Sequence, residues 1–397
     1  MFYKSLIFVF GMEDFICFRH HLHSIAELSG KEVKTSQFIF NYLQSLNPDF
    51  LKVVADNGAI AVFKGNIHGV SAAFRADIDA LPIQEINDLH YSSTNPGISH
   101  KCGHDGHATI LAAFAKFISE NRPSSGNVTL IFQPAEETGQ GAADIIQSTE
   151  FNALNPEYIF GMHNLPGFPK NNVIIRDNYF ACASHGMIIK LKGVASHASE
   201  PEKGISPAHL LSELLAEVPS LQNCDTSNPN YSLCTITHVN MGTYAFGLSP
   251  ADAVVLVTIR AYSNHILEEV TLKLKDMVRG KAIQMGIEYS FEIVEKFPPT
   301  INNEEANIIV KRAAHIARLG VIEATEPFKW SEDFGNYSLN LSSKHGDSTV
   351  KASFFGLGAG ENTPNLHNSE YDFPDDIIDS GVELLKHIYK SLFEIED

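Results

Sequence analysis

The middle of the chain carries an order of strands and helices that few folds can accommodate. Apolar alternation predicts four strands there, at residues 187–192, 231–239, 253–261 and 287–294. Helical spacing predicts one helix that opens at Ser206-Pro207 and runs to about residue 218, and a longer helix over residues 267–285. The resulting order, β-α-β-β-α-β, is that of a ferredoxin-like domain.

Both flanks of this region alternate strands and helices in a different style. The predicted strands are residues 70–74, 127–132 and 352–356, and the predicted helices are residues 108–118, 305–319 and 375–393. Such alternation predicts a mostly parallel sheet with helices on both faces. A chain of 397 residues also exceeds the size at which single cores usually stop growing. We therefore predict one α/β domain, residues 12–183 and 298–397, interrupted by an inserted domain of residues 184–297.

Side chains of metal-binding type follow the predicted strands of the flanks or precede a helix. Residues 130–137 (LIFQPAEE) form an apolar run that breaks at a proline and ends in two adjacent carboxylates. Parallel strands end at one edge of a sheet, which is where open α/β sheets place their chemistry. Thiol, imidazole and carboxylate groups are the ligands of borderline metals. The predicted ligands are Cys102, His104, Glu137, His163 and His367.

Five ligands suggest two ions, because structural zinc sites usually have four ligands and are closed. Glu136 stands beside the ligand Glu137, and we predict that it is the general base, which takes a proton from the attacking water and passes it to the leaving nitrogen. A further ligand or a plain surface acid is the alternative for Glu136. Asp77 is predicted to orient a ligand imidazole, with Asp79 and Asp105 as alternatives. His107 is either a ligand or a helix-capping residue.

Net charge and cysteine content indicate which binding partners and which cellular compartment to expect. A net charge of −18 argues against nucleic acid or an anionic membrane surface as partner. The five cysteines are odd in number and form no CxxC pair, which favours a reducing, cytoplasmic location. The apolar part of residues 4–11 is too short to span a membrane and marginal as a signal peptide, and Met12 is a candidate start.

The order of motifs resembles the aminoacylase/carboxypeptidase-type dinuclear metallopeptidases. Within that family it is most similar to the amidohydrolase branch of hippurate hydrolases, N-acyl-amino-acid deacetylases and auxin-conjugate hydrolases. The similarity extends from about Phe18 onward. The segments that carry it are FRADIDALP (74–82), CGHDGH (102–107), QPAEE (133–137), GMHNLP (161–166), SHA (196–198), SEDF (331–334) and TPNLHN (363–368).

This resemblance implies roles for the predicted residues. Cys102, His104, Glu137, His163 and His367 would bind two divalent ions, with Glu136 as the base. His197, in the inserted domain, looks like the lid histidine that stabilises the tetrahedral oxyanion, which in many relatives comes from the partner subunit. Arg260 looks like the residue that holds the free carboxylate of the substrate, since arginine is the usual bidentate partner of a carboxylate.

The resemblance is not complete. Many relatives carry asparagine at the position of Gly247, and that asparagine helps to bind the substrate carboxylate, so the substrate class stays open at this point. In the N-terminal segment AELS (26–29), relatives usually have proline at the position of Ala26.

We therefore expect a metal-dependent amidohydrolase that cleaves the amide bond of N-acyl amino acids or a short peptide bond. The ions are expected to be manganese or zinc, with cobalt or nickel as further options. A homodimer through the inserted lid domain is the expected assembly. The alternatives are a dipeptidase, a carbamoyl or ureide amidohydrolase on the same frame, a non-catalytic metal-bound binding protein, and a purely structural metal site.

Overall fold

The computed structural model describes residues 15–344 and 350–393, so the apolar segment at residues 4–11 and the candidate start Met12 lie outside the described part. The chain divides into two compact units. The first combines the part of the chain up to Phe180 with Ile301–Thr325 and the part from Asp333 onward. The second comprises Ala181–Thr300 and Glu326–Glu332, so that a short downstream segment joins the inserted region.

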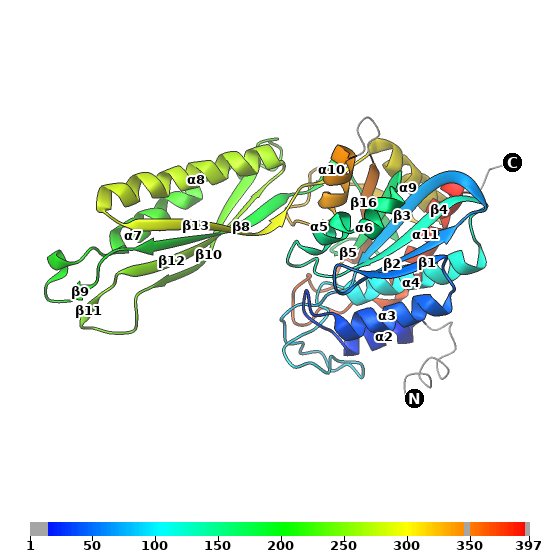
Figure 1. The fold of residues 1–397 in the computed structure, drawn as a ribbon, viewed down its shortest axis with the longest axis horizontal. Coiled ribbons are helices and arrows are strands. Elements are labelled where there is room, and N and C mark those ends of the chain that lie inside the picture. Colours follow the sequence, from blue (N-terminus) through cyan, green and yellow to red (C-terminus); the bar gives the residue numbers. More distant parts are fainter. Residues whose placement is uncertain (1–14, 345–349, 394–397) are drawn as a thin grey trace. The chain divides into compact units, whose positions relative to one another are not determined.

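An eight-stranded sheet forms the centre of the first unit (Figure 1). In spatial order its strands are β1 (Phe50–Val54), β2 (Gly58–Lys64), β4 (Ser125–Gln133), β3 (Ile67–Asp77), β5 (Tyr158–Pro166), β16 (Lys351–Gly360), β6 (Asn172–Ile175) and β15 (Gly320–Glu323). The central strands β4, β3, β5 and β16 are mutually parallel. Antiparallel pairings join β1 to β2, β2 to β4, and β6 to β16.

Helices pack on this sheet and enclose its apolar core. They are α2 (Phe15–Ser24), α3 (Val33–Ser45), α4 (His104–Glu120), α5 (Gly141–Gln147), α6 (Thr149–Leu154), α9 (Glu304–Ile316), α10 (Gly335–Lys344) and α11 (Ile378–Phe393), the last preceded by a 3₁₀ turn at Asp375–Ile377. Helix α4 is buried along most of its length because it contacts β3 as well as α2 and α11. Its first residues therefore have fixed positions at the edge of the sheet.

The second unit has the predicted β-α-β-β-α-β order. Its main elements are β8 (Ala183–Lys192), α7 (Ala208–Glu217), β10 (Ser232–Met241), β12 (Asp252–Ala261), α8 (Asn264–Met285) and β13 (Glu288–Phe297). The four strands form an antiparallel sheet in the order β10-β12-β8-β13, and α7 and α8 pack with the alternate strand residues that form its core (Figure 1). The short strands β9 (Ser196–His197) and β11 (Leu248–Ser249) pair with each other.

The predicted fold class is confirmed: a mostly parallel α/β sheet with a ferredoxin-like insertion. Among the described residues, no helix combines the length and the hydropathy that a membrane crossing requires. Two further short strands, β7 (Asn178–Ala181) and β14 (Thr300–Asn302), lie where the chain passes between the two regions.

Candidate metal centre

The predicted metal-binding residues of the first unit follow strands that are neighbours in the sheet. Asp77 is the last residue of β3, Glu136 and Glu137 come directly after β4, and His163 lies within β5. The loop that carries His367 follows β16. Because these four strands are parallel and adjacent, their carboxyl ends meet at one edge.

Among the groups of three donor residues that the described residues form, two consist of predicted ligands alone. In each group, one ligand atom from every residue lies within 4.8 Å of the others. The first group is Cys102, His104 and His163, and the second is Cys102, Glu137 and His367. The structure thus brings all five predicted ligands together, with the Cys102 sulfur common to both groups. These five residues would hold two divalent ions.

The hydrogen bonds of His104 show which of its two ring nitrogens faces the other donor atoms. Its Nδ1 lies 2.9 Å from the carbonyl oxygen of Asp79 and 3.1 Å from Asp79 Oδ1, so Nδ1 carries the proton and donates it. Its Nε2 and the Glu137 Oε1 atom are buried, have no hydrogen-bond partner in the described structure, and lie 3.8 Å apart. Buried polar atoms are nearly always satisfied, so an imidazole lone pair and a carboxylate oxygen facing each other in this way fit a bound cation.

The adjacent carboxylates Glu136 and Glu137 lie on a tight turn, which is fixed by hydrogen bonds from its backbone to two other acidic side chains. Ala135 adopts a left-handed φ of 52°, which is uncommon for a residue with a Cβ, and its N–H donates to Glu32 Oε1 at 2.8 Å. The Glu137 N–H donates to Asp79 Oδ2 at 3.0 Å. Asp79 therefore holds both His104 and Glu137, while the Asp333 N–H points at Glu136 Oε1 from 3.4 Å.

Burial shifts the titration of the donors. It raises the pKa of the Cys102 thiol well above its usual range, and the charges of Glu137 and Glu136 add to this rise. Burial also raises the pKa of Glu137 to about 7. For His104 burial opposes the charged ring, but the carboxylates of Asp77 and Asp79 outweigh it and raise the pKa to about 10. A divalent ion reverses this balance, because its charge favours the thiolate and the carboxylate.

Asp77 and His107 contact each other in this structure. Asp77 Oδ1 lies 2.6 Å from His107 Nδ1, whereas His104 Nε2 is 3.9 Å from the Asp77 carboxylate. The hydrogen bond that orients the predicted ligand His104 therefore comes from Asp79. His107 Nε2 lies 2.6 Å from Asn164 Oδ1 and 3.0 Å from the Asn164 backbone nitrogen, so both ring nitrogens of His107 lie within hydrogen-bond distance of other residues.

A buried arginine, Arg75, connects Asp77 to the surroundings of Glu136, the predicted base. Arg75 donates to Asp77 Oδ2 at 2.7 Å, to Gln133 Oε1 at 2.8 Å and to Asp333 Oδ1 at 2.9 Å. The Asp333 carboxylate is fully buried, and the backbone N–H of the same residue faces Glu136. Sequence reasoning missed Arg75 and Asp333 as contributors, although both lie in the FRADIDALP and SEDF segments quoted above.

Gly103 is required by the close approach of Asn164. Its φ is 91°, and a Cβ at this position would lie 2.1 Å from Asn164 Oδ1. The glycine therefore lets Cys102 and His104 flank the turn that starts α4.

His197 and Arg260 belong to the second unit. His197 is exposed on β9, and its Nδ1 accepts the Ser199 N–H at 3.1 Å, so the neutral ring carries its proton on Nε2. Arg260, on β12, donates to Ser331 Oγ at 2.8 Å, which fixes one side of the guanidinium group. The carbonyl oxygen of Gly247 accepts the Ala198 N–H at 3.1 Å, next to His197.

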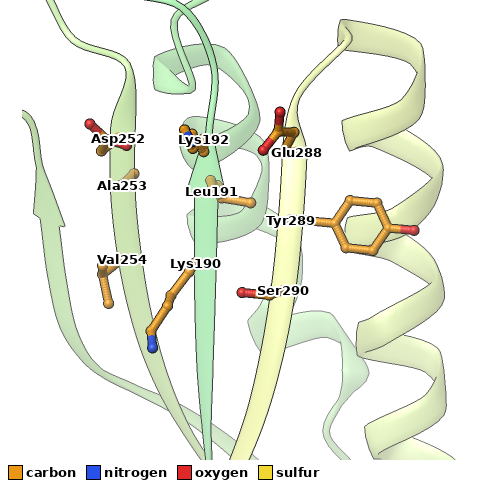
Figure 2. Close-up of a pocket in the computed structure, with 9 residues that line it drawn as sticks. All are labelled: Lys190, Leu191, Lys192, Asp252, Ala253, Val254, Glu288, Tyr289 and Ser290. Carbon is orange, nitrogen blue, oxygen red and sulfur yellow. The ribbon is translucent and has the colours of Figure 1, made fainter.

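A pocket of about 390 Å³ also lies in the second unit, at the ends of β8, β12 and β13 (Figure 2). Its lining residues are Lys190, Leu191, Lys192, Asp252, Ala253, Val254, Glu288, Tyr289 and Ser290. It contains none of the predicted site residues, and its charged side chains are exposed, so it is distinct from the donor groups described above.

Comparison with known proteins decides the family. The sequence profile of peptidase family M20/M25/M40 matches residues 73–391. The chain belongs to this family. An uncharacterised hydrolase of Staphylococcus epidermidis is 30% identical over 384 residues, which cover 95% of this chain and 97% of the relative. The M20 chain is thus a metal-dependent hydrolase of amide or peptide bonds.

Two solved structures are similar in fold to this M20 chain. A dinuclear metal-binding peptidase of the M20 family from Bacillus subtilis has a TM-score of 0.77 and 25% identity, covering 96% of this chain and 98% of its own. An aminobenzoyl-glutamate utilization protein from Klebsiella pneumoniae has a TM-score of 0.70 and 19% identity, with 94% of each chain covered, and shows the shared fold. The resemblance drawn from the motifs is confirmed.

Proposed function

We propose that this M20 hydrolase cleaves the amide bond of N-acyl amino acids of the hippurate or N-acetyl type. The observation that supports the proposal is the pair of donor groups that share Cys102, with Glu136 beside them. One Glu136 oxygen lies within 4.8 Å of donor atoms of His104 and Glu137, which is close enough to act on a water molecule at the centre.

The residues fit two divalent ions, held by Cys102, His104, Glu137, His163 and His367. Manganese or zinc is proposed, with cobalt or nickel as alternatives, because imidazole and carboxylate suit all four while the thiol favours zinc. When bound, such ions would polarise the substrate carbonyl and acidify the attacking water. Elemental analysis of protein purified without chelators tests both the number and the identity of the ions.

Each remaining role belongs to a side chain. Glu136 takes the proton of the water and delivers it to the leaving nitrogen. His197 donates from Nε2 to the oxyanion, which agrees with the Nε2–H tautomer that its contact with Ser199 selects. Arg260 binds the substrate carboxylate in a bidentate manner, and this role favours amino-acid products with a free carboxylate.

Glu136→Gln tests the base. The amide keeps the size of the side chain but cannot take a proton, so we expect turnover to fall by at least about 10²-fold while the metal content stays at the wild-type level. Glu361→Gln, at an exposed acid of the loop after β16, is the matched control and should behave as wild type. Near-normal turnover of Glu136→Gln would show that the base is another group.

A substrate panel tests the specificity. N-acetyl and N-benzoyl amino acids should be turned over faster than dipeptides and carbamoyl amino acids, and Arg260→Met should raise KM for substrates with a free carboxylate more than for their amides. A preference for dipeptides or carbamoyl compounds would favour the alternative hydrolases on the same frame.

We also propose a homodimer formed through the second unit and a cytoplasmic location. Strand β10 is an edge strand whose outer half exposes Val239 and Met241, and unprotected apolar edges tend to pair with another chain. Sedimentation of wild type and of Val239→Lys/Met241→Lys tests the dimer. All five cysteines lie in the described residues and form no disulfide, which suits a reducing compartment, and cell fractionation tests that location.

A further inference from the structure

His367 lies on a loop that has no regular secondary structure. The loop spans residues 361–374, the His367 side chain is 52% exposed, and its backbone adopts a left-handed φ of 64°. A left-handed φ is uncommon for a residue with a Cβ, and no helix or strand fixes this segment. The position of His367 must therefore be set by the segments that contact this loop.

Lys101, directly before Cys102, makes two of these contacts. Its carbonyl oxygen accepts the His367 N–H at 2.8 Å, and its Nζ donates to the carbonyl oxygen of Tyr371 at 2.7 Å. One residue thus binds the loop at two points, four residues apart. The ammonium group also donates to Asn87 Oδ1 at 3.1 Å and to Glu85 Oε2 at 3.3 Å.

The Lys101 side chain is fully buried, which is rare for lysine. A buried ammonium group is tolerated only when its charge and its three N–H donors are compensated, and here three acceptors surround it. A second hydrogen bond fixes Glu85, because its Oε2 also lies 3.1 Å from His23 Nε2. The lysine is therefore held rigidly and can in turn hold the loop.

Resting on the metal ligands of the proposed function, we infer that Lys101 is a positioning residue for His367. It fixes the loop at a set distance from Cys102 and so completes the group of Cys102, Glu137 and His367. In the other group, Cys102, His104 and His163, the His104 ring is held by Asp79 at the start of α4 and His163 lies within β5, so neither imidazole is positioned by the ammonium group. Loss of the ammonium group should therefore weaken binding of the ion held with His367 and leave binding of the other ion unchanged.

Lys101→Met tests the inference, because methionine fills similar space, keeps the backbone carbonyl and removes only the ammonium group. Binding of Mn²⁺ and of Zn²⁺ to chelator-treated protein is measured by calorimetry. Wild type should take up two ions; in Lys101→Met one should bind as before and the other about 10- to 100-fold more weakly, as is typical when support of a ligand is removed. Lys351→Met is the control, since Lys351 is also a paired lysine, with Glu305, but is partly exposed and lies at the start of β16, whereas the His367 loop follows the end of that strand.

A double-mutant cycle sharpens the test. His367→Ala should weaken the same ion, and adding Lys101→Met to it should cost nothing further if the lysine acts through His367. If Lys101→Met does not fold, Lys101→Arg retains a buried cation but misplaces its donors, and the same selective loss is expected.

Equal affinities in wild type and Lys101→Met, equal weakening of both ions, or additive effects in the cycle would overturn the inference alone. A wild-type protein that binds fewer than two ions would overturn the metal assignment of the proposed function and the inference with it.

Discussion

His23 lies between two carboxylates in the fully buried region behind the metal centre. Its Nδ1 is 2.9 Å from Asp105 Oδ2 and its Nε2 is 3.1 Å from Glu85 Oε2, so both nitrogens face acceptors and both carry protons. Burial opposes the charged ring, but the hydrogen bonds and charges of Asp105 and Glu85 outweigh it and raise the pKa of His23 to about 9. Because a pKa unit corresponds to about 1.4 kcal/mol, the rise from the ordinary value of 6.5 contributes roughly 3 kcal/mol to the stability of the folded state.

The sign of the pH dependence follows from which state holds the proton. The unfolded chain releases it near pH 6.5, whereas the folded protein keeps it to about pH 9. The stabilisation is therefore complete below pH 6.5, declines as the pH rises from 6.5 to 9, and is absent above that range. His23→Gln removes the titrating ring and should remove this part of the pH dependence.

Urea unfolding at pH 6 and pH 9.5 measures the effect. Between these two values wild type should lose about 3 kcal/mol more unfolding free energy than His23→Gln, and the comparison cancels every titrating group that the two proteins share. His265→Gln, at an exposed histidine near the start of α8, should follow wild type. Identical pH slopes for wild type and His23→Gln would refute the assignment of a buried imidazolium.

Three further predictions concern the site and its supports. Arg75→Met leaves the buried carboxylates of Asp77 and Asp333 without their shared cation and should lower the unfolding free energy by about 3–5 kcal/mol, measured by urea titration; a loss below 1 kcal/mol would contradict the network. Gly103→Ala forces a Cβ against Asn164 Oδ1 and strains the backbone, so metal affinity, measured by calorimetry, should fall, and unchanged binding would refute the close approach. Free Mn²⁺ or Zn²⁺ at about 100 times its Kd should add roughly 2.7 kcal/mol per ion, seen as a higher Tm that a chelator reverses, and a Tm insensitive to metal would count against a folded-state site.

The sequence predicted those features that repeat along a strand or helix. Apolar alternation located β8, β10, β12 and β13 to within a few residues, and their order identified the ferredoxin-like insertion. The sequence also predicted that the donors meet at one edge of the sheet, since residues after parallel strands lie there, and the structure brings these side chains together. The β1–β2 hairpin and the antiparallel β6 were not predicted, since nothing in a short apolar run states the direction of its neighbour.

Finer assignments depended on distances that the pattern cannot supply. Asp77 and Asp79 are two residues apart and would share a face if the strand continued, but β3 ends at Asp77, and it is Asp79 that hydrogen-bonds to the His104 ring. His104 and His107 lie one helical turn apart and are equivalent in sequence. What distinguishes them is a contact with Asn164, 57 residues away in the sequence, whose Oδ1 lies 2.6 Å from His107 Nε2.

The same limit explains why the buried charges were missed, and it shows how the site is built. Charged residues usually lie outside, so Lys101 and Arg75 gave no signal until their partners from distant segments were in place. Buried side chains join different parts of the centre. Asp79 holds His104 and Glu137, and Arg75 connects Asp77 to Asp333, whose backbone N–H faces the Glu136 side chain. Lys101 connects the segment before Cys102 to the His367 loop. Because the predicted ligands come from both sides of the inserted unit, hydrogen bonds between these flanks must hold the ligands in register. We therefore expect metal affinity in this chain to depend on the buried residues behind the donors as well as on the donors themselves.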